Sequence, residues 1–146
     1  MSNSYKHFLS SADEQEVIDA IKQAELNTSG EIRVHIENSA EGDVNKRAIE
    51  VFYLLKMNAT ELQNGVLIYV AVKDKTFAIY GDKGINDIVG PNFWDSTKNV
   101  IQSHFKNGDF KNGLIQGILK SGEQLKKHFP YQKDDKNELS DQISKS

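Results

Sequence analysis

The chain contains no cysteine among its 146 residues and only two prolines. The absence of cysteine excludes disulfides, zinc–thiolate sites and a cysteine nucleophile. Long apolar segments are also missing: the longest, residues 66–72, is far below the roughly 20 residues that a membrane-spanning helix needs. The first residues are polar, and no apolar segment typical of a signal peptide follows them. We therefore expect a cytoplasmic protein without a membrane anchor.

The chain also lacks a strong excess of either charge, since 18 basic and 21 acidic residues give a net charge of −3. The basic residues alternate with acidic ones and form no cluster of the kind that contacts nucleic-acid phosphates. Neither an Asp-x-Asp nucleophile pattern nor a glycine-rich phosphate loop is present. These absences argue against nucleic-acid binding and leave catalytic residues unassigned.

Hydrophobic periodicity predicts helices alternating with strands. We expect helices over 12–26, with Ser11 as the cap, and then over about 43–55, 91–105 and 109–129. Strands are expected over 31–37, 66–72 and 76–80, with a loop over 81–90. The segment 31–37 alternates between polar and apolar residues, which predicts one apolar face. The segment 66–72 is apolar on both faces and is typical of a central strand.

This order of elements predicts an α/β fold: a three-layer α/β/α sandwich around a small mixed sheet. A further short strand would fit this sheet, but no segment of the sequence identifies it. We expect a flexible N-terminus over 1–8, one domain over 9–130 and a disordered polar tail over 131–146. The length suits a single domain.

The topology predicts that three distant segments meet at one edge of the sheet. Strands 31–37 and 66–72 are joined by a helix, so as neighbours they run parallel and begin at the same edge. The strand 76–80 follows in a hairpin, runs antiparallel and ends at that edge. Segments 28–31, 63–65 and 80–82 should therefore lie together.

These segments and the loop after them are rich in oxygen donors. The donors that we assign to a metal ion are Asn64, Asp82, Asp87 and Glu31. The rest of the pocket would come from Thr28, Ser29, Gly65, Gly81, Lys83 and Gly84. Oxygen ligands suit hard cations such as Ca²⁺ or Mg²⁺. Glycine and asparagine also form ordinary turns, which is the simpler interpretation of the same residues.

Several short motifs, taken in order, resemble the TPM domain family, whose founders are thylakoid-lumen, photosystem-associated and receptor-modulating proteins. The motifs are TSGEI at 28–32, NGVLI at 64–68, FAIYGDKGI at 77–85, FKNGDF at 105–110 and GL at 113–114. The resemblance covers about 8–129 and is closest to members without an anchor. It departs at Gln63, where many members carry Asp before the Asn-Gly pair.

The resemblance implies an α/β/α sandwich and a divalent-cation site at Glu31 and Asp82. It also implies two alternatives to cation binding without catalysis. The first is a metal-dependent acid phosphatase, in which Lys83 would contact phosphate. The second is an interaction module that binds an unidentified protein partner during assembly or repair of larger complexes.

Overall fold

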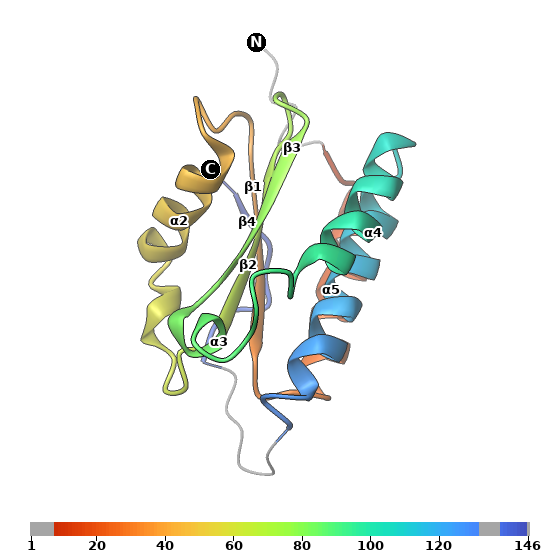
Figure 1. The fold of residues 1–146 in the computed structure, drawn as a ribbon. Helices are drawn as coiled ribbons and strands as arrows, with labels where there is room; N and C mark the ends of the chain where they lie inside the picture. The colour runs from red at the N-terminus through yellow and green to blue at the C-terminus, as the bar shows by residue number, and fades with distance from the viewer. Residues whose placement is uncertain (1–7, 132–137, 146) are drawn as a thin grey trace.

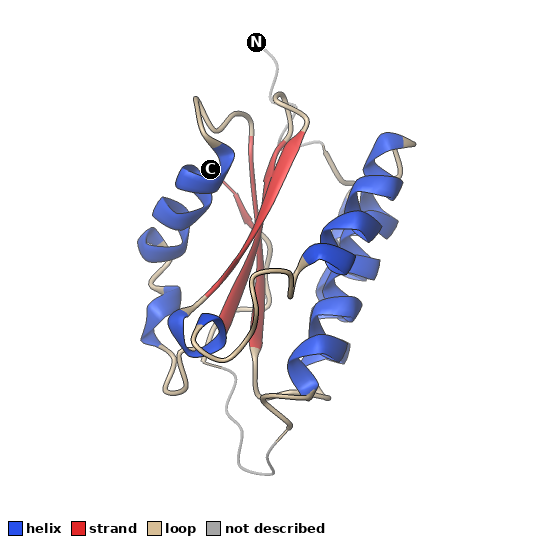
Figure 2. Ribbon diagram, in the orientation of Figure 1, coloured by secondary structure: helices blue, strands red, loops and turns tan. Residues whose placement is uncertain are grey.

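The computed structural model describes residues 8–131 and 138–145. Its elements are α1 (Ser11–Glu25), β1 (Glu31–Glu37), α2 (Val44–Leu54), the 3₁₀-helix η1 (Met57–Ala59), β2 (Gly65–Ala71), β3 (Thr76–Gly81), α3 (Lys83–Asn86), α4 (Asp95–Lys106), α5 (Phe110–Lys126) and β4 (Ser144–Lys145). The four strands form one mixed sheet in the order β3-β2-β1-β4. α2 covers one face, and α1, α4 and α5 cover the other, which confirms the three-layer sandwich (Figures 1 and 2).

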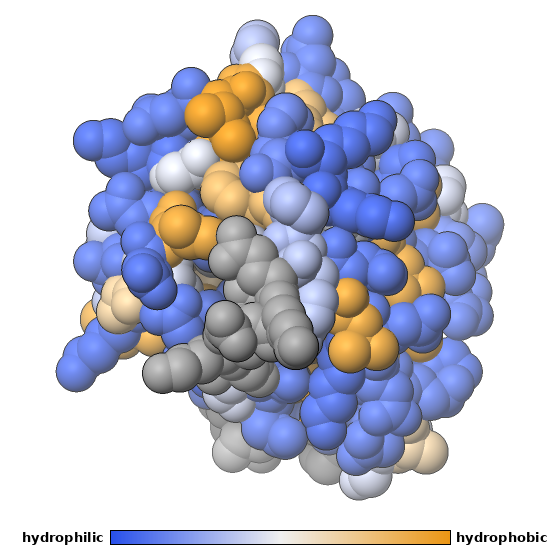
Figure 3. Space-filling model, turned by 90° about the horizontal axis from the view of Figure 1, so that it is seen from below, coloured by the Kyte–Doolittle hydropathy of each residue, from blue (hydrophilic) through white to orange (hydrophobic). Residues whose placement is uncertain are grey.

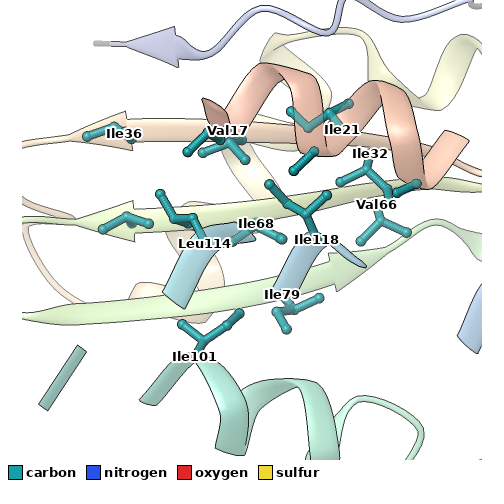
Figure 4. Packing of buried hydrophobic residues seen from close by; sticks show 14 of the residues in the cluster. Val17, Ile21, Ile32, Ile36, Val66, Ile68, Ile79, Ile101, Leu114 and Ile118 are labelled. Carbon is teal, nitrogen blue, oxygen red and sulfur yellow. The ribbon is translucent and has the colours of Figure 1, made fainter. Parts of the chain in front are cut away.

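The register of the sheet decides which side chains enter each layer. β1 runs parallel to β2, with Glu31 beside Gly65, and β3 runs antiparallel to β2, with Gly81 beside Val66. Since side chains alternate along a strand, every second residue faces the three-helix layer. The main core between them includes Val17, Ile21, Ile32, Ile36, Val66, Ile68, Ile79, Ile101, Leu114 and Ile118 (Figure 4).

Three of the four polar residues of β1 are buried, which the alternating pattern did not indicate. Glu31, His35 and Glu37 are at most 4% exposed. Glu37 accepts hydrogen bonds from Arg47 Nε at 2.7 Å, from Arg47 Nη2 at 3.0 Å and from the Tyr69 hydroxyl. Burial of the Glu37 carboxylate is tolerated because the Arg47 guanidinium and the Tyr69 hydroxyl replace the hydrogen bonds that water would make.

Several element boundaries differ from the prediction, and three of the differences concern where a helix begins. Ser10, not Ser11, caps α1, since its hydroxyl accepts the Asp13 N–H at 3.0 Å; either of two adjacent serines could cap. α4 begins at Asp95 because turns occupy 91–94. The expected loop 81–90 contains the single-turn helix α3, which Asp82 caps through the Lys83 N–H at 2.7 Å.

The polar tail also differs from the prediction where it is described. Residues 1–7, 132–137 and 146 of the two predicted flexible ends lie outside the described residues. In contrast, Leu139 is buried, and β4 pairs in parallel with β1 beside His35 and Ile36. β4 is the further short strand that no segment of the sequence identified. It lies at the edge of the sheet and pairs through backbone hydrogen bonds, which require no apolar pattern. No helix of the described chain is long and apolar enough to cross a membrane.

Candidate functional site

The three predicted segments do meet at one edge of the sheet, at the lower end of Figure 1. We call residues 28–31, 63–65 and 80–82 the rim. The Glu31 N–H donates to the Asn64 carbonyl at 3.2 Å, and the Asp82 N–H donates to the Gly65 carbonyl at 2.9 Å. Figure 3 looks onto this end, where the surface is mostly hydrophilic with separate apolar patches. The predicted convergence is confirmed.

Asp82 is the acid of the rim with an unused oxygen. Its side chain is buried, and Oδ1 accepts the Lys83 N–H at the start of α3. Oδ2 is also buried and has no hydrogen-bond partner. Because an unpaired buried oxygen is unfavourable, this atom marks a place where a ligand would restore a lost interaction.

Glu31 and Asp82 lie in one row across the sheet, with Gly65 between them. Glu31 and Gly65 are register partners, and the Asp82 N–H continues the row at the other side of Gly65. Glu31 Oε1 accepts the Leu139 N–H at 2.6 Å. Burial raises the pKa of Glu31 to about 7, against the effect of this hydrogen bond. Two acids therefore flank a residue without a side chain.

Asn64, directly before Gly65, contributes a buried amide to the rim. It is 1% exposed, and its side-chain Nδ2 lies 3.5 Å from the Ser29 hydroxyl. Its backbone N–H donates to the Thr60 hydroxyl at 3.3 Å. The Thr28 hydroxyl bonds the Phe129 carbonyl and accepts the Gly30 N–H at 3.0 Å. Thr28 thus anchors the rim to the segment after α5 rather than presenting a free oxygen.

The glycines of the predicted pocket serve close packing. A Cβ on Gly84 would lie 2.2 Å from the Leu62 carbonyl oxygen and 2.5 Å from that of Gln63. α3 therefore rests directly on the turn that leads into β2. A Cβ on Gly81 would lie 3.3 Å from the ring of Trp94, which is itself buried. These contacts hold Asp82 close to Asn64.

Two predicted residues lie outside the buried part of the rim. Lys83 is exposed, and its backbone N–H is the group that contacts Asp82. Asp87 ends α3, where its N–H donates to the Lys83 carbonyl at 3.0 Å and its side chain is exposed. The structure therefore separates these charges from the buried acids Glu31 and Asp82.

The acids of the rim fit a cation only together with neutral donors. Among the described residues, no group of three or more His, Asp or Glu side chains is arranged to hold a metal ion. One or two carboxylates completed by carbonyl oxygens and water are typical of Mg²⁺ sites, and Ca²⁺ also accepts carbonyl and water ligands. The unpaired Oδ2 of Asp82 fits that chemistry.

Glu25, which no sequence pattern singled out, lies beside the rim. Glu25 Oε2 accepts the Ile32 N–H at 3.1 Å near the start of β1, outside the part of β1 that pairs with β4. Burial, followed by a hydrogen bond with Asp141, raises the pKa of Glu25 to about 9. The carboxyl is therefore protonated at neutral pH. No local signal marks it, because both contacts depend on how α1 and the C-terminal segment pack against the sheet.

Two other concave regions lie away from the rim. A cavity of about 620 Å³ opens at the far end of β2 and β3 and is lined by apolar side chains and two lysines, including Val70, Lys75, Phe77, Phe105, Lys106 and Phe110. A polar cavity lies beside the Glu37–Arg47 ion pair. That pair is saturated, since hydrogen bonds from Arg47 and Tyr69 outweigh burial and lower the pKa of Glu37 to about 2.

Comparison with known proteins identifies relatives of the whole domain. The TPM domain family model matches residues 2–124. The NMR structure of BA42 protein from the psychrophilic bacterium Bizionia argentinensis is 60% identical, has a TM-score of 0.91, and the match covers 95% of this chain and 96% of that chain. No curated protein matches the chain.

Two more distant structures share the fold. The N-terminal domain of cg2496 protein from Corynebacterium glutamicum is 13% identical with a TM-score of 0.64, over 97% of this chain and 82% of that one. The N-terminal domain of a protein from P. gingivalis is 14% identical with a TM-score of 0.66, over 86% and 82%. At these identities the similarity is one of architecture.

Proposed function

Since this chain belongs to the TPM domain family, we propose that it is a divalent-cation-binding domain whose ligands come from the rim. The observation that carries the proposal is the buried, unpartnered Oδ2 of Asp82. Asn64 and Glu31 supply the neighbouring amide and carboxylate, whereas Asp87, exposed just after α3, lies outside the buried part of the rim. Water completes the coordination of the cation. Ca²⁺ and Mg²⁺ are the ions that prefer such oxygen donors.

The proposal assigns no reaction to the site. In the rim, Asp82 Oδ2 is buried without a hydrogen-bond partner, and the side chain of the adjacent Lys83 is exposed. Because no side chain of the rim is positioned as a nucleophile, we assign it ion binding, and hydrolysis by cation-activated water stays the alternative. The cation would hold α3 and the turns before β1 and β2 in one arrangement.

The test is a titration of the full chain with Ca²⁺ and with Mg²⁺, followed by backbone amide NMR and calorimetry. We expect shifts confined to residues 28–31, 63–65 and 81–88, and a loss of affinity of about tenfold or more in Asp82→Asn, because one charged ligand is removed. Absence of shifts in these segments would refute cation binding at the rim.

Asp43→Asn is the matched control. Asp43 also caps a helix and accepts backbone N–H groups, from Asn45 at 2.8 Å and Lys46 at 3.1 Å. It caps α2, which follows the C-terminal end of β1, whereas the rim lies at the N-terminal end of β1. Equal weakening by both variants would indicate loss of fold instead of loss of a ligand. Hydrolysis of a phosphate ester that requires both the cation and Asp82 would support the phosphatase alternative.

A further inference from the structure

The C-terminal segment 138–145, which we call the strap, lies across the rim. β4 at its end pairs with β1, and the Ser144 hydroxyl lies 2.9 Å from His35 Nδ1. Lys145 forms an ion pair with Glu14 of α1 at 2.5 Å. At the other end of the strap, the carboxylate of Glu138 accepts the Glu61 N–H at 3.2 Å. The strap is thus attached at both ends, and Leu139 lies between these attachments.

Leu139 occupies the space that separates the two buried acids. Its backbone N–H donates to Glu31 Oε1 at 2.6 Å, and its side chain is buried. Leu139 Cδ1 lies 3.4 Å from the point where a Cβ of Gly65 would stand. Gly65 is the residue between Glu31 and Asp82 in the row across the three strands. An apolar side chain therefore covers the gap between the two carboxylates.

We propose that the strap regulates the rim by competing with the cation for Glu31. This inference rests on the proposed cation site. A cation bound by both Glu31 and Asp82 must displace the Leu139 N–H from Glu31 Oε1. It must also take the space that the Leu139 side chain fills. The strap and the cation therefore exclude each other, and each weakens the binding of the other by the same factor.

The closed strap lowers the apparent affinity of the site. When only a fraction of the molecules have the strap open and can bind the cation, the apparent dissociation constant equals the intrinsic one divided by that fraction. Opening of the strap removes Glu138 and Leu139 together, and leaves Glu31 accessible to a cation.

The test compares the intact wild-type chain with Leu139→Ala, which weakens the strap without altering the rim. Ca²⁺ alone is titrated into each protein by calorimetry, and hydrogen exchange of the Leu139 amide is measured with and without Ca²⁺. We expect Leu139→Ala to bind Ca²⁺ about tenfold more tightly or better, since burial of a leucine is worth at least that factor. We also expect Ca²⁺ to accelerate exchange at Leu139 in the wild-type chain.

Ser140→Ala is the matched control, because Ser140 is exposed and its side chain accepts the Gln142 N–H at 3.1 Å within the strap. It should bind Ca²⁺ as the wild type does. Equal affinity of wild type and Leu139→Ala, with exchange at Leu139 unchanged by Ca²⁺, would overturn the competition and leave the cation site standing.

Two further outcomes also decide the matter. If Leu139→Ala and Glu138→Gln both bind Ca²⁺ more weakly and Ca²⁺ slows exchange at Leu139, the strap completes the site, and the competition is wrong. If neither the wild type nor Leu139→Ala binds Ca²⁺, the cation site and the competition fall together. The two proposals therefore fail in distinguishable ways.

Discussion

Replacement of Gly84 by alanine should move Asp82 away from the turn that carries Asn64. The added Cβ would lie 2.2 Å from the Leu62 carbonyl oxygen and 2.5 Å from the Gln63 carbonyl oxygen. Both are backbone atoms, so no side-chain rotation relieves the overlap. α3 must move away by about 1 Å to restore ordinary contact distances, and Asp82, which begins α3, must move away from Asn64, which follows Gln63.

The overlap should lower the free energy of unfolding. Overpacking of this kind costs about 1–3 kcal/mol, and weakening of the Asp82 cap adds about 1 kcal/mol. We therefore expect the free energy of unfolding to fall by about 3 kcal/mol, which for a chain of this length corresponds to roughly 6–12 °C in Tm. An alanine in an unobstructed helix would instead be stabilising by about 1 kcal/mol.

Thermal and urea unfolding followed by circular dichroism would measure this effect. Gly90→Ala is the matched control, since no heavy atom lies within 4 Å of its added Cβ and its φ is not in the left-handed region. The control should be neutral or slightly stabilising, because alanine restricts the unfolded chain. A Gly84→Ala protein as stable as Gly90→Ala would refute the close contact between α3 and the turn before β2.

Two buried carboxyls should give opposite pH dependences. The pKa of Glu37 is lowered from 4.5 to about 2, so its ion pair with Arg47 stabilises the fold above pH 4.5 by about 3 kcal/mol and this is lost as the pH falls toward 2. Glu37→Gln should lack that loss in urea unfolding at pH 2–7; an unchanged pH profile would contradict the buried ion pair. The pKa of Glu25 is raised from 4.5 to about 9, so the wild type should lose stability as the pH rises between these values. Glu25→Gln should be more stable than wild type at pH 8, on the order of 2 kcal/mol, because only the wild type must bind a proton to fold at that pH, and the two proteins should converge near pH 4.

The arrangement of the central strands was predictable from local pattern alone. The apolar run 66–72 indicated a strand covered on both faces, and every residue of β2 is buried. The helix between β1 and β2 and the hairpin after β2 then required the turns before β1 and β2 to lie beside the end of β3. Periodicity and connection rules were sufficient because both depend on residues close in sequence.

The chemistry of the rim depended on tertiary contacts. Glu31 and Leu139 are 108 positions apart, and their hydrogen bond leaves no periodic signal in either segment. The burial of Glu25 and the unpaired oxygen of Asp82 likewise follow from packing between elements. The sequence alone determined which oxygen donors share one edge of the sheet. Only the folded chain decided which of them are buried, paired or free, because desolvation and hydrogen bonding depend on what the rest of the protein places over each group.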